Sequence, residues 1–561
     1  MQIQPQFYSL GTLFNGRLFR IPEYQRAYSW QPKHRAALFS DIKKVQLSGE
    51  DSTHFMATIV GLRRGKRSIA ADEYVDIEVV DGQQRLTTLT ILLRAVAKAL
   101  SKAETKYSQE IQSLLVKGDD LSLLLLQTNH DMSNVFIDYF RKGKLHQKES
   151  AQTAADVNLV EAIAECEAFV DGWTNQTGVG IVQLFAIIKN RLSVIFHEIE
   201  DEALVYTVFE VLNSRGLDVT WFDKLKSLLM AIVFEHGDDG SKKEIIRELH
   251  KLWTEIYRTI GLRQNLNRET VRFAGTLRSS KSVNRPLPEE GAVDVLAGAC
   301  QDDPSAVVSM SEWLLEVTKA EHELLSNRRL GVARNIIQAR LVAIAVLLRN
   351  FPKTEQESIL RKWESVTFRI YGLGGGDART KVGDYVRLAW RITNEGLSRS
   401  EIIDELDRIG KEFPIDKVVK ELAGTDCYQG WTEELRYFFF RYEEFLALKP
   451  GQSLSNSEWN RIWEVEPSRS IEHVLPRSKG SEKSTTKGFF VHRLGNLILL
   501  PPGVNSQLQD DNPADKASFY QSCGLLLAAE VGDQIQKSRW SRKAAEIREK
   551  QLIEWATTEW K

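Results

Sequence analysis

An acidic residue beside a histidine, followed by two asparagines, is the pattern in this 561-residue chain most suited to chemistry. The pair is Glu472-His473 in "IEHVLP", and Asn496 and Asn505 flank a second apolar run. Histidine can deprotonate water near neutral pH, and carboxylate and amide oxygens suit Mg²⁺. The set could hydrolyse a phosphodiester, with His473 as general base and Glu472 and Asn505 as metal ligands. We expect Asn496 to serve this centre by pinning the loop that orients His473.

Basic residues outnumber acidic ones around this pair. They are Arg469, Arg477, Lys479, Lys483, Lys487 and Arg493, against Glu472 and Glu482. Such a patch suits phosphate, and His492 could contact a phosphate as well. Two plainer interpretations stay open: a solvated charged loop, and a surface histidine before a proline turn.

A second polar cluster, "DGQQR" at residues 81–85, stands where an apolar run gives way to a helical period. The free N–H groups of a first helical turn attract anions, and Gly82 would let a ligand approach the backbone. Arg85 could pair with phosphate, and Asp81 could hold a metal or polarise a water. Gln83 and Gln84 could hydrogen-bond a sugar, a base or a water. The alternative is a helix that merely begins with polar residues.

Two further segments carry residues of the same kind. "IPEYQRAYSW" at 21–30 interleaves aromatic residues with arginine, which could stack on bases or form a small core edge. "NSRGLDVT" at 213–220 places Asn213, Arg215 and Gly216 in a loop between helices. No GxxxxGK[ST] occurs, so a nucleotide site here would not be a P-loop.

The elements around "DGQQR" are two strands and a helix. Residues 54–64 and 73–80 are rich in β-branched residues and predict strands, with the polar stretch 61–74 as a loop or hairpin tip. From Gln83 onward the apolar period becomes helical, and its stripe consists of Leu86, Leu89, Leu93, Val96 and Leu100.

The rest of the chain is mostly helical until its last hundred residues. Residues 150–440 show helical periodicity, interrupted near 213–216 and by a glycine-rich turn at 371–385. A polar stretch near 441–460 predicts a linker. The final segment then reads strand, loop, strand and helix, before a last charged helix.

Composition limits the classes of protein. The length predicts two or three domains, and a net charge of -2 argues against coating nucleic acid by bulk charge. Four separated cysteines without a CxxC pair suit a reducing compartment and disfavour structural zinc. There is no signal-peptide pattern and no apolar run near 18 residues. We therefore expect a cytoplasmic protein without membrane spans.

Two sets of motifs resemble known families. "IPEYQRAYSW", "VVDGQQRLTTL" and "FEVLNSRGLDVT", in this order, resemble the ParB/sulfiredoxin-like domain of GmrS-type proteins. "IEHVLP" with "HRLGNLILL" and a later asparagine resembles the HNH (ββα-metal) domain of GmrD. A chain with both resembles the fused GmrSD type IV, modification-dependent restriction enzymes, over roughly residues 8–230 and 440–556.

The resemblance implies a multidomain α+β fold. It places a nucleotide-binding sensor domain at 1–230, a helical middle region at 231–440 and an HNH endonuclease domain at 441–561. The implied activity is nucleotide-regulated cleavage of double-stranded, modified phage DNA, with Mg²⁺ or Mn²⁺ and a nucleoside triphosphate (GTP, ATP or another) as cofactors. A homodimer is possible.

The resemblance also implies residue roles. The nucleotide site would comprise Tyr24, Gln25, Arg26, Asp81, Gly82, Gln83, Gln84, Arg85, Asn213 and Arg215, with Asp81 catalytic. The nuclease centre would comprise Glu472, His473, Asn496 and Asn505, and DNA contacts would come from Arg477, Lys479, His492 and Arg493.

Two other functions stay open from sequence. One is a DNA-sensing adaptor with an inactive nuclease domain, and the other is an RNA-directed or abortive-infection nuclease. The intact Glu-His and asparagine set argues against the first. HNH chemistry by itself does not exclude RNA.

Overall fold

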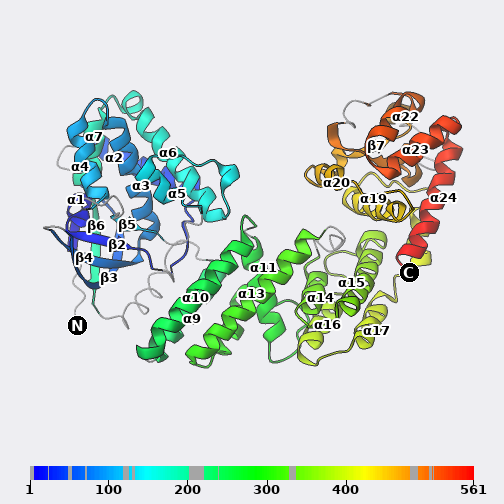
Figure 1. The fold of residues 1–561 in the computed structure, drawn as a ribbon, viewed down its shortest axis with the longest axis horizontal. Helices are drawn as coiled ribbons and strands as arrows, with labels where there is room; N and C mark the ends of the chain where they lie inside the picture. The colour runs from blue at the N-terminus through cyan, green and yellow to red at the C-terminus, as the bar shows by residue number, and fades with distance from the viewer. Residues whose placement is uncertain are drawn as a thin grey trace. The chain divides into compact units, whose positions relative to one another are not determined.

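The computed structural model describes residues 6–22, 25–48, 53–69, 72–117, 125–128, 133–200, 220–237, 239–263, 265–327, 336–479, 490–503, 508 and 511–561. The chain forms two compact units. Unit 1 comprises Met1–Gly275 and Leu287–Lys319, and unit 2 comprises Thr276–Pro286 and Ala320–Lys561 (Figure 1). The helical middle region expected at 231–440 contributes helices to both units.

A six-stranded mixed sheet lies at the centre of the first part of unit 1. Its order is β1-β6-β3-β4-β2-β5. The strands are β1 (Gln6–Ser9), β2 (Arg17–Arg20), β3 (His54–Ile69), β4 (Asp72–Asp81), β5 (Leu126–Gln127) and β6 (Leu192–Ile199). β3 pairs antiparallel with β4 and parallel with β6, while β2 pairs parallel with β4 and β5.

The structure corrects the loop expected at 61–74, because most of these residues belong to β3 and β4. β3 extends to Ile69 and β4 begins at Asp72, with a register shift between Arg63 and Gly65. Cross-strand ion pairs line this extension, namely Arg64–Glu78, Lys66–Glu73 and Arg67–Asp76. Polar side chains suggested a loop, but here they pair across an exposed antiparallel ribbon.

Helices pack beside this sheet, most of them on one side of it (Figure 1). They are α1 (Leu10–Phe14), α2 (Pro32–Leu47), α3 (Gln83–Leu100), α4 (Thr105–Leu115), α5 (Val135–Lys142), α6 (Ala154–Thr177) and α7 (Ile181–Ala186), with short turns at Lys148–Ser150 and Ile187–Arg191. The predicted helix after Gln83 and its apolar stripe are confirmed. α3 also buries Ile91 and Leu92 beside that stripe, so it is a central helix of this core.

The remaining helices of unit 1 follow a segment, residues 201–219, that lies outside the described residues. They are α9 (Trp221–His236), α10 (Asp239–Ile260), α11 (Asn265–Arg278), α12 (Glu289–Gly298) and α13 (Pro304–Ser326). α11 and α13 end within unit 2. The predicted helical character of this part of the chain is confirmed.

In the residues of unit 2 that the structure describes, helices are accompanied by one short strand pair. Its helices are α14 (Ile337–Leu347), α15 (Lys353–Thr367), α16 (Val382–Asn394), α17 (Arg399–Gly410), α18 (Ile415–Val418), α19 (Thr432–Ala447), α20 (Asn456–Trp463), α22 (Pro513–Ser522), α23 (Leu526–Lys537) and α24 (Arg542–Glu559). A π-helical segment, η4 (Phe368–Leu373), precedes the expected glycine-rich turn. The pair is β7 (Ile471–His473) and β8 (Leu497–Leu499).

The structure also corrects the linker expected near 441–460. α19 and α20 share one hydrophobic core with β7, β8 and the last three helices, through residues such as Phe440, Leu446, Trp459 and Ile462. The polar residues between α19 and α20 form a surface loop. A surface loop and an interdomain linker have the same polar composition, and the burial of the flanking aromatic residues identifies this segment as a loop.

The structure also describes the four cysteine residues and the hydrophobicity of the helices. All four cysteines are buried and unpaired. Among the residues that the structure describes, no helix combines the length and apolar character needed to cross a membrane.

Candidate functional site

The β7–β8 pair positions the two residues that the sequence places at a nuclease centre. Glu472 pairs in register with Ile498, and His473 with Leu497. Adjacent strand residues project to opposite faces, so the two side chains have different neighbours. Both side chains are buried.

Glu472 contacts α22. Its Oε1 accepts a hydrogen bond from Lys516 Nζ at 2.6 Å and another from Tyr520 Oη at 3.0 Å. Lys516 Nζ also donates to the carbonyl oxygen of His473 at 3.1 Å, and its side chain is fully buried. Burial raises the pKa of Glu472, while the charge of Lys516 opposes that shift.

This arrangement does not fit Glu472 as a ligand of Mg²⁺. An ammonium group already occupies the position beside Oε1 that a cation would take. Asn505, the other expected ligand, lies outside the described residues. Within the described ranges, no three His, Cys, Asp or Glu side chains gather in a way that could hold a metal ion.

His473 contacts a second histidine on the other face of β7. His473 Nε2 lies 3.0 Å from Nδ1 of His492, and both rings are buried. The Tyr428 ring stacks on His492 at a centroid distance of 5.1 Å and meets His473 edge-on at 4.8 Å. The Arg477 guanidinium lies over the same tyrosine ring.

Electrostatics keep His473 neutral. Burial, followed by the nearby positive charges of His492, Arg477 and Lys516, lowers the pKa of His473 to about 3. Burial also lowers the pKa of His492, although Asp426 opposes the shift. A neutral imidazole is the form that can accept a proton, and an approaching phosphate anion would raise its pKa again.

Asn496 fixes the loop next to His473. Its Oδ1 accepts hydrogen bonds from Leu475 N at 2.9 Å and Trp540 Nε1 at 3.2 Å, and its Nδ2 donates to Leu475 O at 3.1 Å and Val491 O at 2.9 Å. The side chain is fully buried. These bonds hold the loop that follows His473 against Val491 and Trp540.

The expected DNA contacts differ in their surroundings. Arg477 is exposed, whereas His492 is buried beside His473. Arg493 forms ion pairs with Glu546 and Glu549 of α24, so its charge is already balanced. The side chain of Lys479, like Asn505, lies outside the described part of the chain.

Sequence reasoning missed several residues of this centre. They are Tyr428, Lys516, Tyr520, Trp540 and Arg548, whose guanidinium donates to the carbonyl groups of Gly495 and Leu497. Lys516 is the one with a local signal, because it lies in the helix that follows the second strand. The others come from segments with no motif of their own.

The "DGQQR" turn joins β4 to α3 in unit 1, as the sequence predicts. Gly82 is the N-cap of α3 with φ of 90°, a left-handed conformation that favours glycine. A Cβ there would lie 2.9 Å from Ile59 Cγ1. Asp81 Oδ1 accepts a hydrogen bond from Gly82 N at 2.7 Å. The glycine is therefore required by the turn itself.

The glutamines of this turn hold the segment 25–31 in place. Gln84 Oε1 accepts from Ser29 N at 2.7 Å, and Gln84 Nε2 donates to Ala27 O at 3.0 Å. Gln83 Nε2 donates to Gln25 Oε1 at 2.8 Å, and Gln25 Nε2 donates to Val80 O at 2.7 Å. All three side chains are buried. Their amide groups thus bind the chain, which differs from the expected contacts to sugar or base.

The two charged residues of the turn, Asp81 and Arg85, have opposite charges and are largely shielded from solvent. Burial raises the pKa of Asp81, while Gly82 N–H, Arg85 and Arg26 oppose the shift. Burial likewise lowers the pKa of Arg85, whose guanidinium lies 5.7 Å from the Trp30 ring centroid. An anion bound beside Arg85 and Arg26 would offset this loss of solvation.

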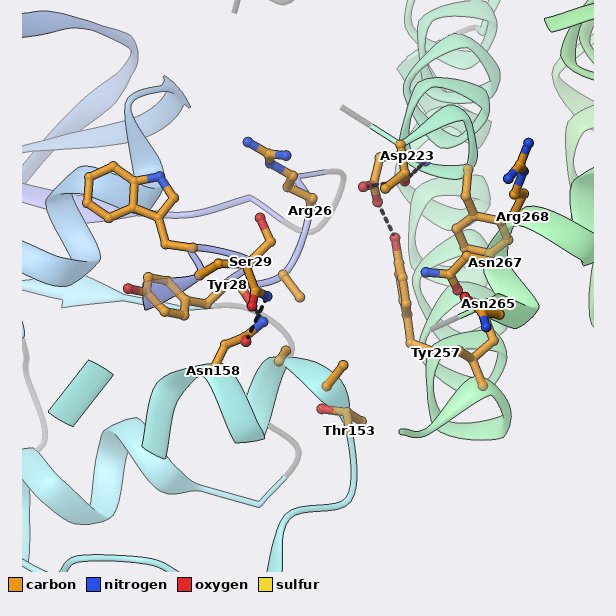
Figure 2. Close-up of a pocket in the computed structure, with 18 of the residues that line it drawn as sticks. Arg26, Tyr28, Ser29, Thr153, Asn158, Asp223, Tyr257, Asn265, Asn267 and Arg268 are labelled. Carbon is orange, nitrogen blue, oxygen red and sulfur yellow. Dashed lines mark hydrogen bonds between the residues drawn. The ribbon is translucent and has the colours of Figure 1, made fainter. Parts of the chain in front are cut away.

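A pocket of about 540 Å³ opens beside residues 26–31 (Figure 2). Its walls are residues 26–31, the first turn of α6, and parts of α9, α10 and α11. Among its lining residues are Arg26, Tyr28, Lys33, His34, Asn158, Trp221, Asp223, Tyr257, Asn265, Asn267 and Arg268. Among the expected nucleotide-site residues that the structure describes, Arg26 alone lines this pocket. Tyr24, Asn213 and Arg215 lie outside the described residues.

Polar groups converge on this pocket. Tyr257 Oη donates to Asp223 Oδ1 at 2.9 Å (Figure 2). Asn267 Oδ1 is buried without a hydrogen-bond partner among the described residues. Lys226, fully enclosed one turn further along α9, has its Nζ 3.5 Å from Gln25 O. Lys226 follows the "NSRG" motif in sequence, and this contact connects it to the "YQR" segment.

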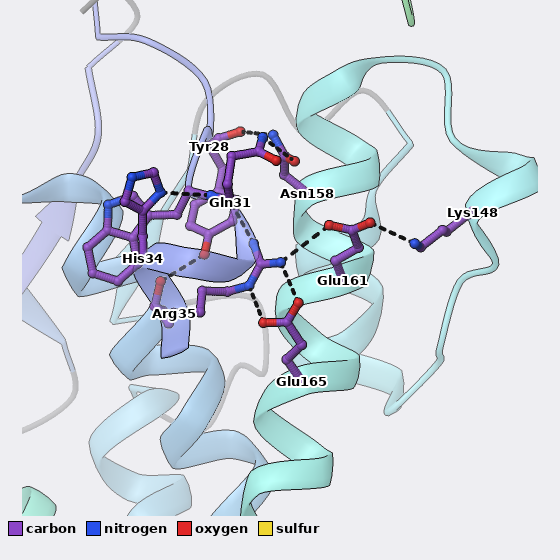
Figure 3. Close-up of polar contacts among 10 residues, drawn as sticks. Tyr28, Gln31, His34, Arg35, Lys148, Asn158, Glu161 and Glu165 are labelled. Atoms are coloured by element: carbon purple, nitrogen blue, oxygen red, sulfur yellow. Dashed lines mark hydrogen bonds and ion pairs between the residues drawn. The ribbon is translucent and has the colours of Figure 1, made fainter. Parts of the chain in front are cut away.

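A buried arginine supports the pocket wall from behind (Figure 3). Arg35 of α2 donates from Nε and Nη2 to the two carboxylate oxygens of Glu165, each at 2.7 Å, and from Nη2 to Glu161. Its Nη1 donates to the carbonyl oxygen of Trp30. Gln31 Nε2 donates to Asn158 Oδ1 at 3.1 Å. These bonds fix the segment 28–31 against α6.

The chain matches two family models. Residues 10–230 match the GmrSD restriction endonuclease N-terminal domain, and residues 414–555 match the GmrSD restriction endonuclease C-terminal domain. No curated protein sequence matches the chain. The C-terminal match begins before α18, so it includes the loop that supplies Tyr428.

Proposed function

The chain belongs to the GmrSD restriction endonucleases, and on that premise we propose that it cleaves modified phage DNA through His473 under control of a nucleotide bound in unit 1. The observation that carries the nuclease half is the neutral, buried His473 at the end of β7, held by His492 and by the loop that Asn496 fixes. The nucleotide half is supported by the pocket beside Arg26.

Cleavage proceeds by hydrolysis at phosphorus. The imidazole of His473 accepts a proton from water, and the resulting hydroxide attacks the phosphorus atom. The bond from phosphorus to the leaving sugar oxygen breaks, and that oxygen takes a proton from solvent. Arg477 is exposed beside the site and contacts a DNA phosphate, whereas Arg493 keeps its ion pairs with α24.

The dependence of cleavage on Mg²⁺ or Mn²⁺ is to be measured. The resemblance implies a divalent metal, while the carboxylate of Glu472 is paired with Lys516. The steps above use only His473 and water.

The unit 1 pocket has the chemistry that a nucleoside triphosphate needs. The first turns of α6 and α9 line it, and the positive ends of helices attract phosphate. Arg26 adds a cation, while Trp221 offers an aromatic ring and Asn265 and Asn267 offer amides for a base or ribose. Its volume is within the range of small-molecule sites.

Asp81 and Arg85 act next to this pocket in the proposal. Arg26 connects the two places, since it lines the pocket and its charge acts on Asp81. A triphosphate that extends toward Arg85 would bring its phosphates to the carboxylate that polarises the attacking water. The resemblance implies that Asn213 and Arg215 also belong to this site, and both lie outside the described residues.

The first experiment compares cleavage of two DNAs, unmodified plasmid and phage DNA with modified cytosines. Each is incubated with Mg²⁺ or Mn²⁺, or without either, and with or without GTP or ATP. Cleavage of modified DNA alone, altered by nucleotide, is the expected result. His473→Ala should lower the rate about 100-fold or more. His54→Ala, a partly exposed histidine of unit 1, is the matched control and should cut normally.

The other outcomes discriminate among functions. Equal cleavage of both DNAs would remove modification sensing. Cleavage of RNA with both DNAs left intact would favour an RNA-directed nuclease, and no cleavage of any nucleic acid would favour an adaptor.

Nucleotide binding has its own variant pair. Arg26→Ala should weaken binding of GTP or ATP about 10- to 100-fold in a calorimetric titration, because a charged contact to phosphate is lost. Arg67→Ala, on the exposed β3–β4 ribbon, is the matched arginine control. Equal affinity in both variants would contradict the assignment of the pocket.

A further inference from the structure

The contact between His473 and His492 has two possible proton arrangements, and they differ in their chemical consequences. The two nitrogens, His473 Nε2 and His492 Nδ1, are 3.0 Å apart, so one of them donates and the other accepts. Each neutral imidazole carries a single N–H. The position of the shared proton therefore fixes the state of the other ring nitrogen of His473, Nδ1.

In the first arrangement, His473 Nε2–H donates to His492 Nδ1. Nδ1 of His473 is then unprotonated and can accept a proton from water. In the second, His492 Nδ1–H donates to His473 Nε2. A neutral His473 would then carry its proton on Nδ1 and would have no lone pair to offer. Only the first arrangement makes His473 a general base.

We propose that His492 is a positioning residue of the nuclease centre: its Nδ1 accepts the Nε2–H of His473 and so keeps His473 Nδ1 available as the base. This inference rests on the proposed nuclease function and replaces the expectation that His492 contacts a DNA phosphate.

Contacts among the described residues constrain the His492 ring and the chain that carries it. The Tyr428 ring is nearly parallel to it, with an interplanar angle of 10°. The carbonyl oxygen of His492 accepts a hydrogen bond from Cys427 N at 2.9 Å, which joins the two chain segments. The two histidine rings are tilted by 74° to each other, so the edge of one faces the edge nitrogen of the other. The ring plane is thus fixed by packing before any substrate binds.

Burial by itself does not distinguish the two histidine residues, since 6% of His473 and 7% of His492 is exposed. The distinction comes from the contacts of His492, because the Tyr428 ring stacks on it and its Nδ1 lies 3.0 Å from His473 Nε2. A side chain that orients another needs such fixed geometry. Among the described residues, the charged groups that act on the pair include Asp426, Arg477 and Lys516, and Arg493 beside His492 is paired with Glu549.

Two substitutions separate this role from simple packing. In His492→Asn, the side-chain Oδ1 replaces Nδ1 as a hydrogen-bond acceptor. His492→Leu fills similar space with no acceptor. We expect kcat for DNA cleavage to stay within about tenfold of wild type in the first variant and to fall about 100-fold in the second. KM and DNA affinity without divalent metal should be unchanged in both.

The tautomer itself can be observed. Long-range ¹H–¹⁵N correlations on the full chain labelled with ¹⁵N-histidine report which ring nitrogen carries the proton, and His473→Gln assigns the signal. Wild type and His492→Asn should show Nε2–H for His473, and His492→Leu should lose that pattern. If His492→Leu does not fold, the wild-type spectrum still decides between the two arrangements.

Several results would overturn the proposal. These are an Nδ1–H tautomer of His473 in the wild type, equal loss of kcat in the two variants, or a rise in KM alone, which would indicate a phosphate contact. The tautomer measurement needs no substrate. A chain that cuts no DNA but shows the Nε2–H tautomer would therefore contradict the nuclease function and leave the positioning inference standing.

Discussion

The "DGQQR" turn of unit 1 and the β7–β8 pair of unit 2 use amide side chains in the same way and charged side chains in different ways. In both, buried amides bind the backbone of a distant segment: Gln84 holds residues 27–29, and Asn496 holds Leu475 and Val491. In unit 1, burial shifts the pKa values of Asp81 and Arg85 toward their neutral forms, and the carboxylate of Asp81 accepts a hydrogen bond from Gly82 N. In unit 2, burial also raises the pKa of Glu472, but its carboxylate forms an ion pair with Lys516 at 2.6 Å.

This difference indicates which region is prepared for a ligand. Asp81 and Arg85 have pKa values shifted by burial toward their neutral forms, so a bound anion or cation would stabilise the site. In the candidate nuclease centre, Lys516 is paired with Glu472, and burial lowers the pKa of His473. We therefore expect unit 1 to respond to small charged ligands and the unit 2 centre to be formed before DNA binds.

The largest effect that the comparison predicts is that of Asn496→Ala. Four hydrogen bonds end at this fully buried side chain, and the backbone groups of Leu475 and Val491 would lose their partners. The free energy of unfolding should fall by about 3–5 kcal/mol. Urea denaturation followed by tryptophan fluorescence measures it. Normal stability with lost cleavage would instead make Asn496 a substrate contact.

Gln84→Ala is the matching change in unit 1. It leaves Ser29 N–H and Ala27 C=O without their partner, and we expect a loss of about 2–4 kcal/mol in the same assay. Lys98→Ala, at an exposed position of the same helix, should change stability by less than about 1 kcal/mol. If Gln84→Ala weakened nucleotide binding while stability stayed unchanged, the amide would belong to the ligand and not to the scaffold.

The pH dependence of unit 2 provides a third test. Glu443 of α19 accepts hydrogen bonds from Leu526 N and Leu527 N at the start of α23, yet burial raises its pKa from 4.5 to about 7. The folded chain thus binds more protons than the unfolded chain between these values. The contribution of Glu443 to stability is present at low pH and is lost as pH rises toward 7.

Glu443→Gln should remove this dependence, because the amide does not titrate. We expect the wild type to lose about 2–3 kcal/mol relative to the variant between pH 4.5 and 7.5, measured as the difference in their urea midpoints. Parallel pH profiles of the two proteins would show that Glu443 stays ionised. Asp81, whose pKa is also raised, provides the corresponding position in unit 1.

The sequence by itself determined the local elements and the places where chemistry could occur. The β-branched residues of 73–80 predict a strand and the apolar period after Gln83 predicts a helix, and both elements are present. Gly82 likewise reveals its turn, because only glycine adopts that φ at low cost next to Ile59. Likewise, Glu472 and His473 are adjacent in a strand, which already implies that they face different neighbours.

Tertiary structure alone decided what each polar side chain does. Lys516, Tyr428 and Arg548 come from segments far from "IEHVLP" in sequence, and no local pattern predicts a hydrogen bond or ring contact across such separations. The glutamines of "DGQQR" are suited equally to a ligand and to the backbone of residues 25–29, and the packing of that segment decided between them. A buried polar group must find a partner, and its type alone does not specify which one.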